Sequence, residues 1–463
     1  MNDPILVARL RALWDDLDSV SDKLKKSAWP LDQTATRAEM LKESLWIGLE
    51  VTLRNEINEQ KRDIKKIEYV MTEPTISDPS VLAAAWTDYA KVFQESQSVL
   101  RECLKIIESL AIRNQDLDKR IWYVADQLIS ECLLLSIGCW EYYLLVHGME
   151  DTFNKTRSQI LRLRFPEWTI WDLPLAVHEV SHVIIRKKLQ EEKEKSKRRR
   201  ILESFVQKQR DSLVELDPEL NVQNKAGGKK AGRTRRFAED RVHEFLADAF
   251  ATYTMGPAYA CSAILLRLNP SFGASDGMPS DVQRVYVILN MLIWANTHWP
   301  LSPYQAVIEE LQGYWNETLK RVNPHGKLTS NYENWLKQLT EEFGKEVGPN
   351  TFRTSALYPL EEDREGWLHA QRWAQEWLEQ TNSKNNFNEP NTSSVNLRDA
   401  LNAVWLCRLQ IVKTTKQEDI NQQIRRLKNL EEVGQKLCST IIFSKDNSST
   451  QQHVPGPSAG GRL

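Results

Sequence analysis

The segment His178-Glu179-x-x-His182 contains two histidines four positions apart, with a glutamate directly after the first. It lies in an apolar stretch, 175–185, that predicts a helix. Side chains four residues apart share one helix face, so both imidazoles can bind one zinc ion while Glu179 faces a metal-bound water. This spacing predicts metal-assisted hydrolysis. A core helix whose histidines only make hydrogen bonds is the alternative.

The residues around this motif favour a metal site. Asp172 and Pro174 predict the start of the helix, because a proline in the first turn loses no hydrogen bond there. Apolar residues are expected to bury the other faces of the helix: Val177, Val180, Val183 and Ile184. A rigid, apolar environment that excludes water keeps the ligands of a zinc site in their geometry.

A second helix, expected over 241–251, offers the third ligand that a catalytic zinc site needs. Glu244 and Asp248 are four residues apart and share one face of this helix. Glu244 can complete a site of two histidines and one glutamate, while Asp248 accepts the free N–H of a ligand histidine. His243 is the rival ligand, although it points about 100° away from Glu244 on the helix.

The two motifs together resemble the gluzincin zinc peptidases, over about residues 173–257. The Glu-x-x-Ala-Asp form after Arg241 is most similar to the subgroup with the CAAX-processing and heat-shock membrane proteases. This resemblance implies His178, His182 and Glu244 as zinc ligands, Glu179 as general base and Asp248 as the residue that orients a ligand histidine. The chain departs from that subgroup because it has no evident membrane span and a long charged insertion before Glu244. The resemblance therefore supports the chemistry better than any substrate.

Hydrolysis of an amide also needs a donor that stabilises the oxyanion. Tyr253, Tyr259 and His298 are the candidates, each with ordinary packing as the alternative. The sequence contains no phosphate-binding loop, nucleophile elbow or clustered Cys-x-x-Cys that would indicate another chemistry.

The composition of the 463 residues predicts a folded protein of the cytoplasm. The hydrophobic content of 41% suffices for a sizeable core, and the net charge of -2 gives no general reason to expect nucleic acid or a membrane surface as partner. The six cysteines have no framework spacing, which fits a reducing compartment. The first residues lack the pattern of a secretion signal. The longest apolar stretch, 132–146, is too short to span a membrane and is expected to be a core helix.

The hydrophobic periodicity predicts a mainly α fold. An apolar stripe with helical spacing precedes Glu73-Pro74 and consists of Trp46, Leu49, Leu53, Ile57, Ile64 and Ile67. A turn is expected at 75–80, a second helical block over about 81–147, and a short strand near 158–165. The expected parts are a helical N-terminal region (1–150), a zincin-like metallopeptidase domain with at most a small sheet (151–380), a linker (381–396), a C-terminal helical segment (397–443) and a disordered tail (444–463).

A charged insertion, 187–236, separates the two predicted ligand helices. Its first part, 191–200, is expected to continue the helix of His182 into solvent. Its second part, 226–236, is basic and rich in glycine, which predicts a mobile loop. Such a loop can gate the cleft, be cut during activation or recognise an acidic partner. Nucleic acid is not favoured, because no aromatic residues alternate with the basic ones.

The C-terminal half is rich in tryptophan, with members at Trp294, Trp299, Trp315, Trp335, Trp367, Trp373 and Trp377. Core packing is the expected role, and a groove for a peptide substrate or a protein partner is the alternative. An amphipathic helix over about 420–437 either docks on the rest of the chain or binds a partner.

The sequence favours a zinc metallopeptidase that acts on a protein or peptide, with a regulatory, stress or defence role by analogy only. The first alternative is a helical interaction protein whose zinc site is structural or inactive. The second is a zinc amidohydrolase that acts on a small molecule in a narrow pocket.

Overall fold

The computed structural model describes most of the chain. The described residues are 4–27, 37–72, 79–114, 121–135, 144–148, 152–153, 160–164, 169–190, 197–217, 220–221, 228–275, 277–298, 303–322, 328–352, 356–358, 365–381, 396–414 and 420–450. Contacts divide the chain into two compact units, one of Met1–Trp122 with Glu141–Glu167 and one of Tyr123–Trp140 with Trp168–Leu463. The fold is mainly α, as predicted.

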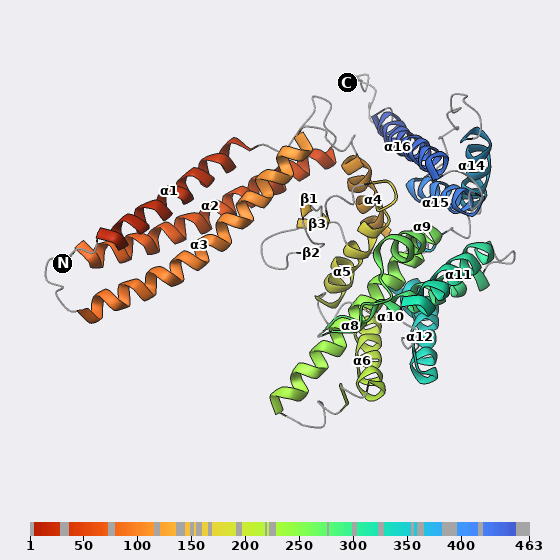
Figure 1. The fold of residues 1–463 in the computed structure, drawn as a ribbon, viewed down its shortest axis with the longest axis horizontal. Helices are drawn as coiled ribbons and strands as arrows, with labels where there is room; N and C mark the ends of the chain where they lie inside the picture. The colour runs from red at the N-terminus through yellow and green to blue at the C-terminus, as the bar shows by residue number, and fades with distance from the viewer. Residues whose placement is uncertain are drawn as a thin grey trace, which may run out of the picture. The chain divides into compact units, whose positions relative to one another are not determined.

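Three long helices form the first unit: α1 (Pro4–Lys26), α2 (Arg37–Thr72) and α3 (Pro79–Asn114). They lie side by side and each packs on the other two (Figure 1). The apolar stripe predicted before Glu73-Pro74 is buried in this bundle together with the apolar faces of α1 and α3. The turn expected at 75–80 falls mostly outside the described residues, and α3 already begins at Pro79.

A small sheet also belongs to the first unit. Its strands β1 (Leu144–Gly148), β2 (Thr152–Phe153) and β3 (Ile160–Arg164) lie in the order β1-β3-β2. The central strand β3 pairs parallel with β1 and antiparallel with β2. The strand predicted near 158–165 is therefore confirmed.

The predicted core helix over 132–146 is wrong in its second half. Helix α4 (Ile121–Leu135) ends before it, and Leu144, Leu145 and Val146 belong to β1. A short run of apolar residues does not distinguish a buried strand from a buried helix, which explains the error. The units also divide the chain differently from the boundary expected at residue 150, because 123–140 cluster with the second unit.

Helix α8 (Gly228–Met255) organises the second unit. It packs against α5 (Leu175–Gln190), α6 (Lys197–Leu216), α10 (Asp281–Thr297) and the short α9 (Pro257–Ser262). The remaining elements are η1 (Ala263–Arg267), α11 (Gln305–Val322), α12 (Ser330–Glu342), η2 (Phe343–Val347), α13 (Gly348–Thr351), α14 (Glu365–Thr381), α15 (Leu397–Thr414) and α16 (Ile420–Thr450).

The mobile loop predicted at 226–236 is wrong for the part that the structure describes. Residues 228–236 are the first turns of α8, while 222–227 fall outside the described residues. Alanine, lysine and arginine form helices readily, and they outweigh the glycines that suggested a loop. The helix of His182 is predicted to continue through 191–200. Helix α5 is described only to Gln190, and residues 197–200 belong to a separate helix, α6, which begins at Lys197.

The tryptophans serve core packing, as predicted. Six of the seven named above are buried, and Trp299 lies outside the described residues.

Helix α16 packs on α15, so the predicted C-terminal helix docks on the chain. Helix α16 reaches Thr450, so the disorder expected from residue 444 is wrong up to residue 450. Residues 451–463 and most of the linker expected at 381–396 lie outside the described residues. None of the described helices is both long and apolar enough to cross a membrane.

Candidate metal centre

Helices α5 and α8 bring the predicted ligands together. On α5, a turn held by the bond from Thr169 Oγ1 to Asp172 Oδ2 (2.6 Å) leads into the helix, which begins one residue after Pro174. The apolar positions of α5 and α8 are buried against their surroundings: Val177, Val180, Val183, Ile184, Val242, Phe245 and Leu246. This packing directs the face of α5 that carries the two histidines toward the face of α8 that carries Glu244.

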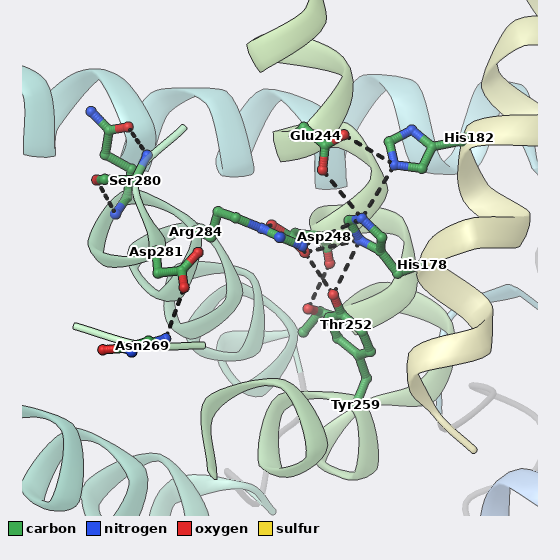
Figure 2. A network of polar contacts seen from close by, with 11 residues as sticks. His178, His182, Glu244, Asp248, Thr252, Tyr259, Asn269, Ser280, Asp281 and Arg284 are labelled. Carbon is green, nitrogen blue, oxygen red and sulfur yellow. Dashed lines mark hydrogen bonds and ion pairs between the residues drawn. The ribbon is translucent and has the colours of Figure 1, made fainter. Parts of the chain in front are cut away.

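Three side chains meet between these helices, namely His178, His182 and Glu244 (Figure 2). The Nε2 atoms of the two histidines are 3.2 Å apart. Glu244 Oε2 lies 3.3 Å from His178 Nε2, and Glu244 Oε1 lies 3.4 Å from His182 Nε2. Because these three groups converge and are largely buried, they can hold a metal ion.

Asp248 lies behind His178, on the side away from the other two ligands. Its Oδ1 is 3.0 Å from His178 Nδ1, and its side chain is 0% exposed. A carboxylate at this position accepts the Nδ1–H, so Nε2 is the ring nitrogen that faces the ligand cluster and can bind a metal ion once it is deprotonated. Tyr259 on α9 donates a hydrogen bond to the same Asp248 oxygen at 2.6 Å, and its hydroxyl lies 3.2 Å from His178 Nδ1.

Arg284 is a site residue that the sequence reasoning missed. It comes from the first turn of α10, where Ser280 and Gln283 form a capping box. Its Nε donates to Asp248 Oδ2 and its Nη2 to Asp248 Oδ1, both at 2.8 Å, while Nη2 also lies 3.3 Å from His178 Nε2. The available signal is weak: Arg284 is the one basic residue of α10, a helix whose residues are mostly apolar.

Burial and charge set the protonation of this network. Burial lowers the pKa of His178, but the charge and hydrogen bond of Asp248, together with the hydrogen bond to Glu244, outweigh burial and raise this pKa to about 9. Burial lowers the pKa of His182 to about 4, against the opposing charge of Glu244. Burial would raise the pKa of Glu244, but His182 and His178 lower it to about 2. Burial would also raise the pKa of Asp248, but Arg284 and His178 together lower it. Both carboxylates are therefore ionised at neutral pH.

The other predicted site residues lie in different surroundings. Glu179 follows His178 on α5 and is half-buried. His243, the rival ligand, is not part of the ligand cluster. Its Nε2 is buried without a hydrogen bond from the described part of the chain, and burial lowers its pKa.

The structure brings only one of the three predicted oxyanion donors to the site. Tyr259 is there, but its hydroxyl is engaged with Asp248 and the Nδ1 side of His178. Tyr253 lies nine residues after Glu244, which places it on the opposite face of α8, where it stacks on Trp294. His298 ends α10 and contacts the Trp294 carbonyl at 2.8 Å.

Comparison with known proteins does not extend these observations. No protein-family model matches the chain, and no curated protein and no solved structure is significantly similar to it. What can be said of the site therefore rests on its own residues. A buried cluster of two imidazoles and a carboxylate, with a second carboxylate behind one imidazole, is suited to binding a divalent metal ion.

Proposed function

We propose that this chain is a zinc-dependent peptidase of the gluzincin type that acts on a protein or peptide in the cytoplasm. The observation that carries the proposal is the convergence of His178, His182 and Glu244, with Asp248 behind His178. These are the ligands and the orienting carboxylate that the resemblance implies, at the positions where the sequence motifs occur.

The spacing of the three ligand groups supports zinc as the metal. In a tetrahedral site with zinc-ligand bonds of 2.0–2.1 Å, neighbouring ligand atoms lie about 3.3–3.4 Å apart. In this cluster the two histidine Nε2 atoms are 3.2 Å apart, and they lie 3.3 and 3.4 Å from the two different oxygens of the Glu244 carboxylate. Two histidines and one glutamate are also the ligand set of catalytic zinc sites, which keep a fourth position for water or substrate.

The residues of the site have distinct tasks in this proposal. When bound, zinc lowers the pKa of its water and polarises the carbonyl of the scissile amide. Glu179 accepts a proton as the water oxygen attacks the carbonyl carbon, and donates it to the amine nitrogen as the C–N bond breaks. Asp248 holds His178 in the tautomer whose Nε2 is free to bind, and Arg284 with Tyr259 holds Asp248 in place.

A helical interaction protein without catalytic metal is the alternative, and one contact favours it. Arg284 Nη2 lies 3.3 Å from His178 Nε2, so a cation already approaches the atom that would bind zinc. In that case the histidines, carboxylates and arginine form a buried polar network that stabilises the packing of α5, α8 and α10.

Replacement of the proposed base separates these two functions. We expect the wild-type chain to cleave members of a mixed peptide library in a manner that a chelator blocks. Glu179→Gln should lower the rate at least about 100-fold, because it removes the proton acceptor. The zinc content and the unfolding temperature should stay unchanged, since Glu179 is not a ligand.

Glu376→Gln, an exposed change on α14, is the matched control and should retain full activity. Mass spectrometry of the peptide mixture measures cleavage. A zinc-loaded wild type that cleaves no peptide, or a Glu179→Gln variant as active as the wild type, would refute the peptidase.

A further inference from the structure

Arg284 uses only part of its guanidinium group to hold Asp248. Nε and Nη2 donate to the two Asp248 oxygens, both at 2.8 Å. Nη2 also lies 3.3 Å from His178 Nε2 (Figure 2). Among the described residues, none accepts a hydrogen bond from Nη1. A guanidinium group carries its five N–H groups in one plane, so the pairing with Asp248 leaves a second edge of the group available.

This second edge consists of Nη1 and Nη2 and lies beside the ligand cluster. Asp248 engages the edge formed by Nε and Nη2, so the other Nη2–H is the one that faces His178 Nε2. An ion about 2.1 Å from His178 Nε2 lies within about 5.4 Å of Arg284 Nη2, because the two distances cannot add to more. The second edge therefore adjoins the place where a substrate reacts.

Burial and charge make Arg284 a strong hydrogen-bond donor. Its side chain is 13% exposed, so little water competes for its N–H groups. Burial would lower the pKa of Arg284, but the charge and hydrogen bonds of Asp248, together with the charge of Glu244, hold it well above its usual value. A fixed cation in such a site stabilises a developing negative charge more strongly than the same cation in water.

The three donors predicted from the sequence do not serve this purpose. The Tyr259 hydroxyl is engaged with Asp248, while Tyr253 and His298 contact Trp294 instead. Arg284 is the donor that the structure places next to a predicted metal ligand.

We propose that the Nη1–Nη2 edge of Arg284 stabilises the negative charge that develops on the carbonyl oxygen of the scissile amide. This inference rests on the proposed peptidase function and assigns the oxyanion donor of its reaction.

The electrons and protons of the step balance around this oxygen. As the water oxygen adds to the carbonyl carbon, Glu179 takes a proton from the water and the π electron pair of the carbonyl moves onto its oxygen. Arg284 donates N–H hydrogen bonds to that oxygen and keeps its own protons. The pair then re-forms the C=O bond as the C–N bond breaks and Glu179 gives its proton to the amine nitrogen.

Binding of two small probes to the metal-loaded full chain tests this assignment without turnover. Cobalt(II) accepts the same ligands as zinc, and its visible absorption reports ligand binding. Dimethylphosphinate has the tetrahedral shape and charge of the oxyanion, so one oxygen can bind the metal while the other accepts from Arg284. Imidazole binds the metal through one nitrogen, and its other nitrogen donates, so it cannot accept from Arg284.

Arg284→Lys separates the two tasks of this residue. Lysine keeps a cation beside Asp248, but one ammonium group does not present the two edges of a guanidinium. We expect the Kd of dimethylphosphinate to rise at least about tenfold and the Kd of imidazole to stay within about twofold. Arg372→Lys makes the same change at an exposed position of α14 and is the matched control, which should alter neither Kd.

Tyr259→Phe shows what a purely positioning role looks like. It removes the other donor to Asp248, so it should weaken metal binding but leave the ratio of the two Kd values unchanged once the metal is saturating. Arg284→Gln keeps an N–H donor for Asp248 without the charge. It should shift the ratio as Arg284→Lys does, and it decides the test if Arg284→Lys takes up no cobalt.

Equal weakening of both probes in the Arg284 variants, or unchanged binding of dimethylphosphinate, would overturn the assignment and leave the peptidase standing. Failure of both Arg284 variants to take up cobalt, while Tyr259→Phe binds it, would show that Arg284 serves only the ligands and would also overturn it. The expected Kd ratio in a chain that hydrolyses no peptide would refute the peptidase and leave Arg284 as the anion-binding group of the metal centre.

Discussion

At the scale of single residues, His178 is the centre of the site because both of its ring nitrogens are engaged. Nε2 faces the ligand cluster, while Nδ1 faces Asp248 and the Tyr259 hydroxyl. Asp248 in turn is held by Arg284 and Tyr259. A fixed tautomer of His178 therefore depends on residues from α8, α9 and α10.

Removal of the Tyr259 hydroxyl tests this dependence. Tyr259→Phe deletes the donor that lies 2.6 Å from Asp248 Oδ1 and keeps the buried ring. We expect the zinc affinity to fall roughly tenfold, since groups that orient a ligand typically contribute 10- to 100-fold. Competition with a chromogenic chelator measures it.

Tyr253→Phe is the control for this substitution, because Tyr253 is also buried on α8 but stacks on Trp294 instead. It should leave the zinc affinity within about twofold of the wild type. The proposed role of Tyr259 would be wrong if the two variants bound zinc equally well.

The sequence revealed the residues that share a helix and missed those that come from elsewhere. His178 with His182, and Glu244 with Asp248, are pairs four residues apart, and helix periodicity alone places each pair on one face. Arg284 lies 36 residues after Asp248, and no local pattern connects the two. Tyr259 was expected as an oxyanion donor, but its actual contacts depend on how the chain turns after α8.

At the scale of elements, the junction of α8 and α9 determines where Tyr259 lies. Gly256 separates the two helices with a φ of 60°, a conformation that disfavours any residue with a Cβ. Asn402 on α15 holds both sides of the junction: its Nδ2 donates to the Met255 carbonyl, and its Oδ1 accepts from the Ala258 N–H, each at 2.9 Å. The sharp turn thus positions Tyr259 against Asp248.

Gly256→Ala should destabilise the second unit. A Cβ at this position would lie 2.7 Å from Tyr358 Cδ1, in addition to the strain of the positive φ. We expect a loss of about 2–4 kcal/mol in the free energy of unfolding, measured with denaturant.

The contrasting variant is Gly313→Ala in α11, where no atom lies within 4 Å of the added Cβ. It should stabilise by about 0.5–1 kcal/mol, because alanine favours a helix interior more than glycine does. A Gly256→Ala chain as stable as the wild type would contradict the assigned role of this turn.

The elements also show where sequence periodicity was insufficient. The long stripe on α2 was predicted correctly, because many turns of one helix repeat the same signal. The strand β1 is predicted wrongly as helix, since its run of three apolar side chains, Leu144 to Val146, is too short to show a period. The first turns of α8 were mistaken for a loop because glycine and charge resemble the composition of a linker.

At the scale of the whole molecule, each unit has its own core. The first unit buries the apolar faces of α1, α2 and α3, and the candidate metal centre lies entirely within the second unit. Separate cores can unfold in separate transitions. The metal should therefore affect only one of them.

Calorimetry of the full chain tests this division. We expect a chelator to lower the unfolding temperature of one transition by about 5–10 °C, because bound metal stabilises only the folded second unit. The other transition should not move with the chelator but should respond to Leu53→Ala, which opens a cavity in the first unit. In His182→Ala the chelator should have no effect, because a ligand is missing. A shift of both transitions with the chelator would contradict the separation of the units.

The zinc content of the purified chain is the most direct test of the central claim. We expect about one zinc ion per wild-type chain by elemental analysis, and loss of that zinc in both His178→Ala and Glu244→Ala. His369→Ala, on α14, should retain it. A wild type that takes up no zinc would show that the network of His178, Arg284 and the two carboxylates is structural. Zinc retained in both ligand variants would show that the metal binds elsewhere.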